Sequence, residues 1–91
     1  MIVNLELFYS PYCSRCHKAR QQLRALTTAW PDGELVLREH DVVKALARAV
    51  AVGVRATPAL AIDGELLAGP VPSPRALRAL IRQQMNGRKS S

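Results

Sequence analysis

The sequence contains only two cysteines and no long apolar run, and each scarcity narrows the possible kinds of protein. Two cysteines are too few for the disulfide framework that stabilises many small secreted domains. No stretch is long and apolar enough to predict a membrane-spanning helix, so we expect no membrane partner. The opening residues, MIVNLELFYS, lack the basic segment, apolar core and cleavage site of a signal peptide. The sequence therefore predicts a cytoplasmic protein, in which a close cysteine pair is more often catalytic or metal-binding than structural.

Acidic and aromatic residues are also scarce. Seven acidic residues against thirteen basic ones give a formal net charge of +6, and aromatic residues make up 4% of the chain. The basic residues are spread along the chain, with Arg15, Lys18, Arg20 and Arg24 on one segment and Arg75, Arg78, Arg82, Arg88 and Lys89 near the end. No base-stacking signature surrounds the four aromatic residues, which are Phe8, Tyr9, Tyr12 and Trp30. We therefore expect no nucleic-acid partner, and instead a preference for acidic proteins or anionic thiols.

Two strands and an intervening helix are predicted in the first half of the chain. Apolar and polar residues alternate over residues 2–9, which is typical of a strand, and Ser10-Pro11 ends it. From residue 16 the apolar side chains recur at steps of three and four, which predicts a helix. Its buried stripe is Cys16, Ala19, Leu23, Leu26 and Trp30. The turn cluster Pro31-Asp32-Gly33 ends this helix, and residues 35–39 follow as a second strand, parallel to the first.

A short helix and a hairpin are predicted next. Asp41 is a good N-cap residue, and Gly53 is a good residue to end the helix. We expect the inward face of this helix to consist of Val43, Leu46, Ala47 and Val50. Residues 59–62 and 65–68 then form two antiparallel strands around an Asp63-Gly64 turn.

A final helix completes the predicted order. Ser73 is its expected N-cap and Pro74 its first residue, and the helix is expected to end near Gly87, with residues 88–91 as a frayed tail. Its inward residues are Leu77, Leu80 and Ile81. Residues 1–91 therefore form one α/β domain in the order β-α-β-α-β-β-α, with a mixed four-stranded sheet flanked by helices. We expect a monomer.

The two cysteines occupy different environments at the junction of the first strand and the first helix. Cys13 precedes the helix, where free backbone N–H groups and the helix dipole stabilise a thiolate. The charges of Arg15, His17 and Lys18 are expected to lower its pKa further. Cys16 begins the buried stripe and should be less reactive. The spacing therefore predicts that Cys13 attacks a substrate disulfide and that Cys16 resolves the mixed disulfide.

Other uses of the cysteine pair remain open at this point. Cys13-Ser14-Arg15-Cys16-His17 also fits the haem-attachment pattern of c-type cytochromes, with His17 as axial ligand. The pair is also half of a zinc site, although only His17 and His40 remain as further ligands and their spacing is not that of a zinc finger. A metal or iron–sulfur cluster bridging two chains, or a purely structural disulfide, is a further alternative. The predicted strands argue against a haem protein, and the sequence predicts no resident metal or other cofactor.

Several segments together resemble the thioredoxin superfamily. Tyr12-Cys13-Ser14-Arg15-Cys16 at a strand–helix junction is similar to the active site of that family. Residues 54–60, VRATPAL, are similar to the segment that contains its cis-proline, and the Asp63-Gly64 hairpin and closing helix also match. The resemblance spans nearly the whole chain and is closest to small, glutaredoxin-sized members. It implies a thioredoxin-like fold in which Pro58 is cis and packs beside the cysteines.

The same resemblance implies an activity and its partners. It implies a protein disulfide oxidoreductase in which the backbone of Thr57 pairs with an extended substrate segment beside Pro58. Tyr12 is a candidate platform for the same substrate. The expected partners are proteins that contain disulfides and a dithiol reductase that recharges the pair.

Several positions depart from the patterns of the family. Thioredoxins have a Trp before the first cysteine and Gly-Pro between the two, where this chain has Tyr12 and Ser14-Arg15. They also have a buried acid where this chain has Leu7, so water or His17 must accept the proton of Cys16. Glutaredoxins have a Gly-Gly pair and an acid before the last helix, where residues 68–73 contain one glycine and no acid. Glutathione is therefore expected to bind poorly, although a glutathione-dependent glutaredoxin remains the first alternative.

Overall fold

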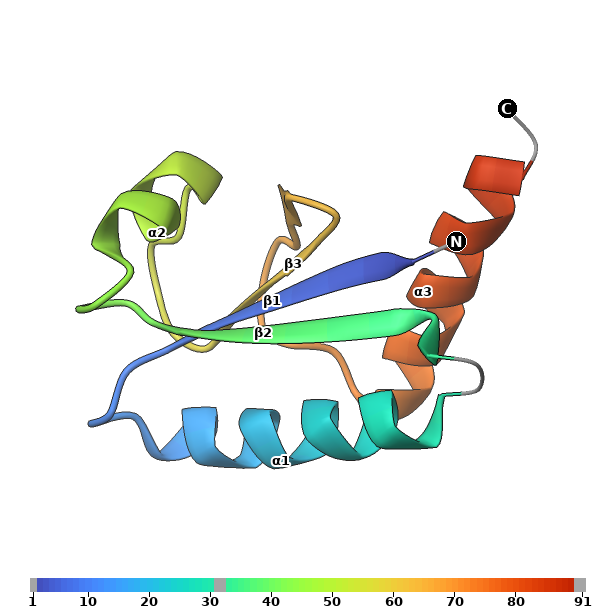
Figure 1. Cartoon of the computed structure of the whole chain (residues 1–91). Coiled ribbons are helices and arrows are strands. Elements are labelled where there is room, and N and C mark those ends of the chain that lie inside the picture. Colours follow the sequence, from blue (N-terminus) through green and yellow to red (C-terminus); the bar gives the residue numbers. More distant parts are fainter. Residues whose placement is uncertain (1, 31–32, 90–91) are drawn as a thin grey trace.

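A computed structural model describes residues 2–30 and 33–89 of the chain. The elements are β1 (Val3–Tyr9), α1 (Ser14–Ala29), β2 (Leu35–Asp41), α2 (Leu46–Val52), β3 (Ala59–Ile62), β4 (Glu65–Leu66) and α3 (Pro74–Lys89) (Figure 1). This is the order that the sequence predicts, and the α/β fold with a mixed four-stranded sheet is confirmed.

The sheet has the strand order β2-β1-β3-β4, so β1 lies in its interior. β1 is parallel to β2 and antiparallel to β3, and β4 returns antiparallel beside β3. The register pairs Phe8 near the end of β1 with Ala59 at the start of β3. The segment just before β3 therefore lies at the same end of the sheet as the segment just after β1.

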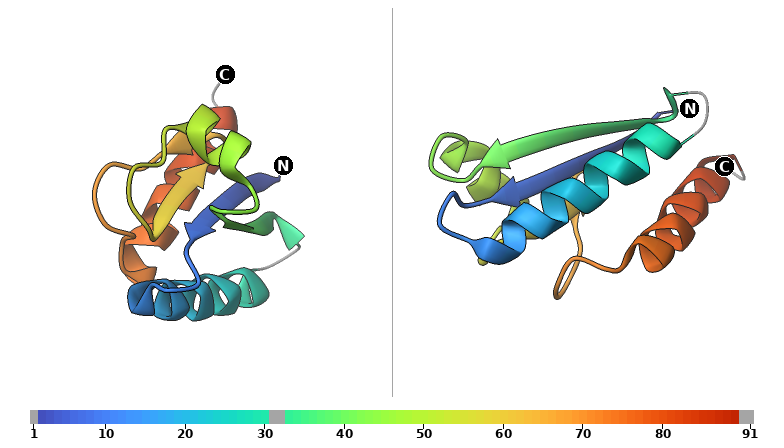
Figure 2. Two further views of the ribbon diagram at one scale, coloured as in Figure 1. Left: turned by 90° about the vertical axis from the view of Figure 1, so that its left-hand side faces the viewer. Right: turned by 90° about the horizontal axis from the view of Figure 1, so that it is seen from below.

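The face of the sheet covered by α1 and α3 holds the larger hydrophobic core (Figure 2). Val3, Leu5 and Leu7 alternate along β1 and are completely buried on this face. The two helices contribute Ala19, Leu23, Leu26, Leu77 and Ile81, all of which the helical periodicity predicts as inward. Burial of one such leucine or isoleucine stabilises the fold by about 1.5–3 kcal/mol. β1 is therefore the strand on which both helices are anchored.

The opposite face carries α2 and a smaller core. Phe8 is buried here among Ala49, Ala59 and Ala61. Because side chains alternate along a strand, Glu6 also points to this face, and it is the one buried charged side chain among the described residues.

An ion-pair cluster compensates the buried carboxylate of Glu6. Arg48 of α2 donates to both of its oxygens at 2.8 and 2.7 Å, and Nε2 of His40 lies 3.0 Å from Oε2. The hydrogen bonds from Arg48 outweigh burial and lower the pKa of Glu6, with a smaller contribution from His40. The cluster thus joins α2 to two strands of the sheet.

The prediction of which residues of the second helix face inward is wrong. Residues 42–45 form turns, α2 begins at Leu46, and its buried residue is Ala49. Val43, Leu46 and Val50 are instead 72%, 61% and 69% exposed. The turn before α2 changes the phase of the helical repeat, and the small side chain of Ala49 allows close approach to Phe8.

The predicted cap of this helix also differs in the structure. Asp41 is the last residue of β2 and accepts a hydrogen bond from the N–H of Val43 at 2.9 Å, within a turn. Ala45 occupies the N-cap position and makes no side-chain capping bond.

Other element ends differ by a few residues. β4 stops at Leu66 rather than residue 68, because the chain bends away into the segment before α3. α3 extends to Lys89, past the end predicted near Gly87, so residues 88 and 89 are helical rather than frayed. Residues 90–91 of the predicted tail, and the predicted turn residues 31 and 32, lie outside the described residues. The predicted cap of α3 is confirmed, since Oγ of Ser73 accepts from the N–H of Ala76 at 3.3 Å.

Replacing Glu6 tests the ion-pair cluster. We expect Glu6→Gln to lower the free energy of unfolding at neutral pH by about 1–2 kcal/mol, because charge-assisted hydrogen bonds are lost. The pKa of Glu6 is lowered in the folded state, so its contribution is complete above the ordinary value of 4.5 and disappears as pH falls through the folded-state pKa. Urea unfolding over a pH series should therefore show the difference from wild type shrinking in acid. Glu65→Gln, on exposed β4, is the control; equal losses in both variants would contradict the assignment.

Candidate functional site

The sulfur of Cys13 caps the first helix. A turn over residues 10–12 links β1 to α1, and the N–H of Cys13 donates to the carbonyl of Ser10 at 3.2 Å. Cys13 has an extended backbone, and its Sγ accepts a hydrogen bond from the N–H of Cys16 at 3.3 Å. A helix N-terminus lacks internal partners for its first N–H groups, so the sulfur takes the place usually held by a Ser or Asp oxygen. This position stabilises negative charge on the sulfur.

The two cysteines differ in accessibility. Both are free thiols; Cys13 is partly exposed, whereas Cys16 is 1% exposed. Cys16 lies one turn into α1 on the inward stripe, as the periodicity predicts. An external reagent therefore reaches Cys13 more readily than Cys16.

The environment moves the two pKa values in opposite directions. The pKa of the Cys13 thiol is lowered, first by its hydrogen bond with the Cys16 thiol, and then by the backbone N–H of Cys16, the side chain of Thr57 and the N–H of Arg15; partial burial opposes these effects. Burial raises the pKa of Cys16, and its hydrogen bond to Cys13 raises it further. Cys13 is therefore the thiol that ionises first.

The basic side chains near Cys13 contribute differently from what the sequence predicts. The charges of Arg15, His17 and Lys18 are not among the causes that lower the pKa of Cys13; Arg15 acts through its backbone N–H. All three side chains are exposed to solvent, where a charge is strongly screened.

Thr57 lies against the cysteine pair although it is 44 positions from Cys13 in sequence. The S–H of Cys13 donates to the carbonyl oxygen of Thr57 at 3.7 Å. The Thr57–Pro58 peptide bond is cis, the conformation that the resemblance implies. The antiparallel pairing of β1 with β3 produces this contact, because it places the start of β3 beside the end of β1. Tyr12 lies on the turn before Cys13 and is 95% exposed.

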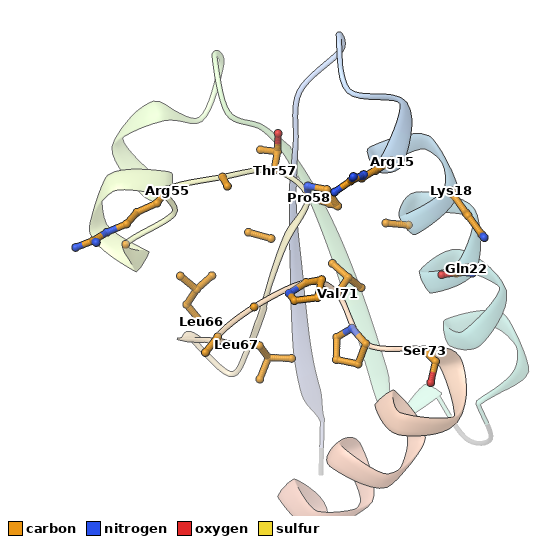
Figure 3. Close-up of a pocket in the computed structure, with 18 residues that line it drawn as sticks. Arg15, Lys18, Gln22, Arg55, Thr57, Pro58, Leu66, Leu67, Val71 and Ser73 are labelled. Carbon is orange, nitrogen blue, oxygen red and sulfur yellow. The ribbon is translucent and has the colours of Figure 1, made fainter.

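A groove of about 860 Å³ extends from this pair of segments (Figure 3). α1 forms one wall, residues 53–59 form another, and residues 66–73 close the far side. Leu66, Leu67 and Val71 give it an apolar surface next to Thr57 and Pro58.

Arg55 and most of the segment before α3 line this groove, although the sequence did not predict that they belong to the site. Arg55 lies inside the VRATPAL segment, so its position two residues before Thr57 was the available signal. The segment at 66–73 has no comparable signal, because it reaches the groove only through the fold.

Among the residues that the structure describes, no buried carboxylate lies beside Cys16 to accept its proton. Leu7 is completely buried in the core, where thioredoxins have an acid according to the pattern above. The buried acid of the described chain, Glu6, points to the opposite face and is bound by Arg48. The raised pKa of Cys16 is therefore not offset by a nearby base, and its proton must pass to water or an exposed group such as His17.

Neither a metal cluster nor a membrane helix is found in the described part of the chain. Within residues 2–30 and 33–89, no three His, Cys, Asp or Glu side chains gather closely enough to hold a metal ion. Over the same residues, no helix combines the length and apolar composition that a bilayer crossing requires.

Known proteins similar to this chain include a thioredoxin-domain family and several thioredoxins of known structure. A family model described as a thioredoxin domain matches residues 3–82. The N21Q mutant thioredoxin of Halobacterium salinarum NRC-1 is 28% identical, with a TM-score of 0.76 over 89% of this chain and 73% of that one. Mitochondrial thioredoxin 3 of Saccharomyces cerevisiae is 26% identical, with a TM-score of 0.71 over 89% of this chain and 77% of that one. A malarial protein with 21% identity and a TM-score of 0.77, covering 91% and 97% of the two chains, shares the fold. A search of the curated proteins found no significant match.

Alkylation of the reduced protein tests the asymmetry of the two thiols. We expect Cys13 to react at least about tenfold faster than Cys16, because it is exposed and ionises first. Its rate should fall as pH drops through a midpoint below the ordinary cysteine value of 9.0. Limited labelling with iodoacetamide followed by peptide mapping measures both rates.

The same labelling in urea is the control for this experiment. Unfolding exposes both thiols, so the two rates should become similar. Preferential labelling of Cys16 in the folded protein would contradict the assignment.

Proposed function

This chain belongs to the thioredoxin-domain family, and we propose that it is a thiol–disulfide oxidoreductase in which Cys13 is the nucleophile and Cys16 the resolving thiol. The observation that carries the proposal is the opposite perturbation of two neighbouring thiols: Cys13 is partly exposed with a lowered pKa, and Cys16 is buried with a raised pKa. This is the arrangement that stepwise disulfide exchange requires, because the first thiol must attack and the second must wait.

In the first step the Cys13 thiolate attacks one sulfur of a substrate disulfide. A bond forms between Cys13 and that sulfur, the substrate disulfide breaks, and the other substrate sulfur leaves as a thiolate that takes a proton from solvent. The N–H of Cys16 holds the attacking sulfur in place through its hydrogen bond of 3.3 Å.

In the second step Cys16 loses its proton and attacks Cys13. The mixed disulfide breaks, the second substrate sulfur leaves as a thiolate and is protonated, and Cys13 and Cys16 become a disulfide. Two protein thiols are thereby oxidised, and one substrate disulfide is reduced to two thiols. Since none of the described carboxylates is buried next to Cys16, its proton passes to water, and resolution becomes faster as pH rises toward the raised pKa of Cys16.

The substrate is held at the segment before β3. An extended segment of a disulfide-containing protein pairs with the backbone of Thr57 beside Pro58, and the exposed ring of Tyr12 lies at the entrance to the site. A dithiol reductase returns the Cys13–Cys16 disulfide to the reduced form. The family match and the contact between Cys13 and Thr57 support this arrangement.

Two serine substitutions separate the roles of the cysteines. Cys13→Ser should abolish attack on any disulfide, because it removes the nucleophile. Cys16→Ser should retain attack but accumulate a mixed disulfide, because nothing remains to resolve it. Mass spectrometry of each protein after incubation with a disulfide-containing peptide measures the trapped species. A Cys16→Ser protein without mixed disulfide, or a Cys13→Ser protein with one, would refute the roles.

Glutathione provides a test of the reductant. Residues 68–73 lack the second glycine and the acid of glutaredoxins, so glutathione should recharge the oxidised protein at least about tenfold more slowly than a dithiol such as dithiothreitol at equal thiol concentration. The rate of reappearance of free thiols in the oxidised protein measures this directly. Recharging by glutathione as fast as by the dithiol would favour the glutaredoxin alternative.

A further inference from the structure

The groove beside the cysteines is positively charged and contains no acid. Its lining includes the cations Arg15, Lys18 and Arg55, and none of its described lining residues is Asp or Glu. All three cationic side chains are exposed to solvent. A bound segment therefore meets cations along its sides and apolar groups along the floor.

Three arginines elsewhere in the described structure are held in ion pairs. Arg20 and Arg24 bind the carboxylate of Glu39 at 2.7 Å, and Arg48 binds Glu6. In contrast, Arg15, Lys18 and Arg55 form no ion pair with any other residue in the part of the chain that the structure describes. Their charge is therefore available to a ligand.

The cations flank the position where the exchange takes place. Arg15 lies between the two cysteines and extends from α1 toward Pro58, whereas Lys18 and Arg55 lie on opposite sides of the groove with their ends turned outward (Figure 3). Arg55 precedes Thr57 by two residues, and Thr57 contacts Cys13. The groove next to the contact between Thr57 and Cys13 thus has cations on two of its walls, Arg15 and Lys18 on α1 and Arg55 on the segment before Thr57.

We propose that this groove selects protein disulfides whose reacting cysteine is flanked by carboxylate side chains. The inference rests on the proposed function, since it names the substrate class of the same site. An extended acidic segment matches the groove because each flanking carboxylate meets an unpaired cation while apolar side chains cover the floor. Opposite charges also accelerate the encounter of the two molecules.

Glutathione fits the same charges less well. It carries an ammonium group together with its two carboxylates, and the described lining offers no acid to bind that ammonium. A segment within an acidic protein has no such ammonium. The exchange itself is the two-electron reaction given above, in which the reduced protein supplies both electrons and no further reductant is needed for a single turnover.

Three disulfide-linked peptide dimers provide the test. They are identical except that the cysteine is flanked on both sides by Glu, Gln or Lys. Mixed with excess fully reduced protein, the Glu peptide should react about fivefold faster than the Gln peptide, and the Lys peptide should be slowest, since exposed ion pairs contribute modestly. Raising the salt concentration to about 0.5 M should bring the three rates together, because the interacting charges are exposed. Loss of the peptide disulfide, followed by chromatography, gives the rates.

Arg55 is the residue to change, because it lies outside the cysteine motif. Arg55→Glu leaves two cations and one carboxylate in the groove, so it should bring the rates of the three peptides close together at low salt, whereas a general loss of structure would lower all three rates alike. Arg38→Glu, an exposed change on β2 at the far edge of the sheet, alters the net charge equally and should keep the wild-type order. Circular dichroism of both variants checks that they fold.

The possible failures are distinguishable. Equal rates for the three peptides with the wild-type protein at low salt, or an undiminished preference for the Glu peptide in Arg55→Glu, would overturn the selectivity and leave the proposed function intact. No reduction of any peptide by protein with both thiols free would overturn the proposed function and the selectivity with it. Faster reaction with glutathione disulfide than with the Glu peptide would show that the groove recognises glutathione instead.

Discussion

The antiparallel pairing of β1 with β3 is the constraint on which the site depends. β1 is buried on both faces and ends just before the turn that leads to Cys13, and its partner begins just after Pro58. Two segments 44 positions apart are thereby brought to one end of the sheet, where the thiol of Cys13 contacts the carbonyl of Thr57. The groove follows from the same pairing, since its walls are α1 and the segments on either side of β3 and β4.

The chemistry of the cysteine pair arises largely from local geometry. The sulfur of Cys13 replaces the usual oxygen of a helix cap, and the helix supplies N–H groups that have no other partner. Cys16 is one turn away on the buried stripe, so it is close enough to donate a hydrogen bond to Cys13 and too shielded to ionise first. One turn of helix thus gives two identical side chains different burial and opposite shifts of pKa.

The charged residues that stabilise the fold differ from those that line the groove. Carboxylates are few in this chain, and two of them, Glu6 and Glu39, are each held by arginine within the fold. Arg48 ties α2 to the sheet, and Arg20 and Arg24 tie α1 to β2. The cations around the groove have no such partners among the described residues, so the basic excess of the sequence is available next to the reactive thiols.

The element order, the parallel first unit, the hairpin, the position of Cys13 at the start of the first helix and the cap at Ser73 were all predicted from the sequence, because periodicity, turn residues and capping residues act over a few positions. The burial of Cys16 beside the more exposed Cys13 was predicted for the same reason. The inward face of α2 was not predicted correctly, because the turns at 42–45 change the phase of the helical repeat. The packing of Ala49 in the cluster around Phe8 then decides which side of the helix is buried. Three other features likewise bring together residues that are distant in the chain. They are the ion pair of Glu6 with Arg48, the contact of Thr57 with Cys13, and the position of Arg55 in the wall of the groove. The sequence by itself therefore determined the order of the elements and the different burial of the two thiols, and only the tertiary structure decided which distant side chains surround them, because strand pairing and packing depend on the whole fold.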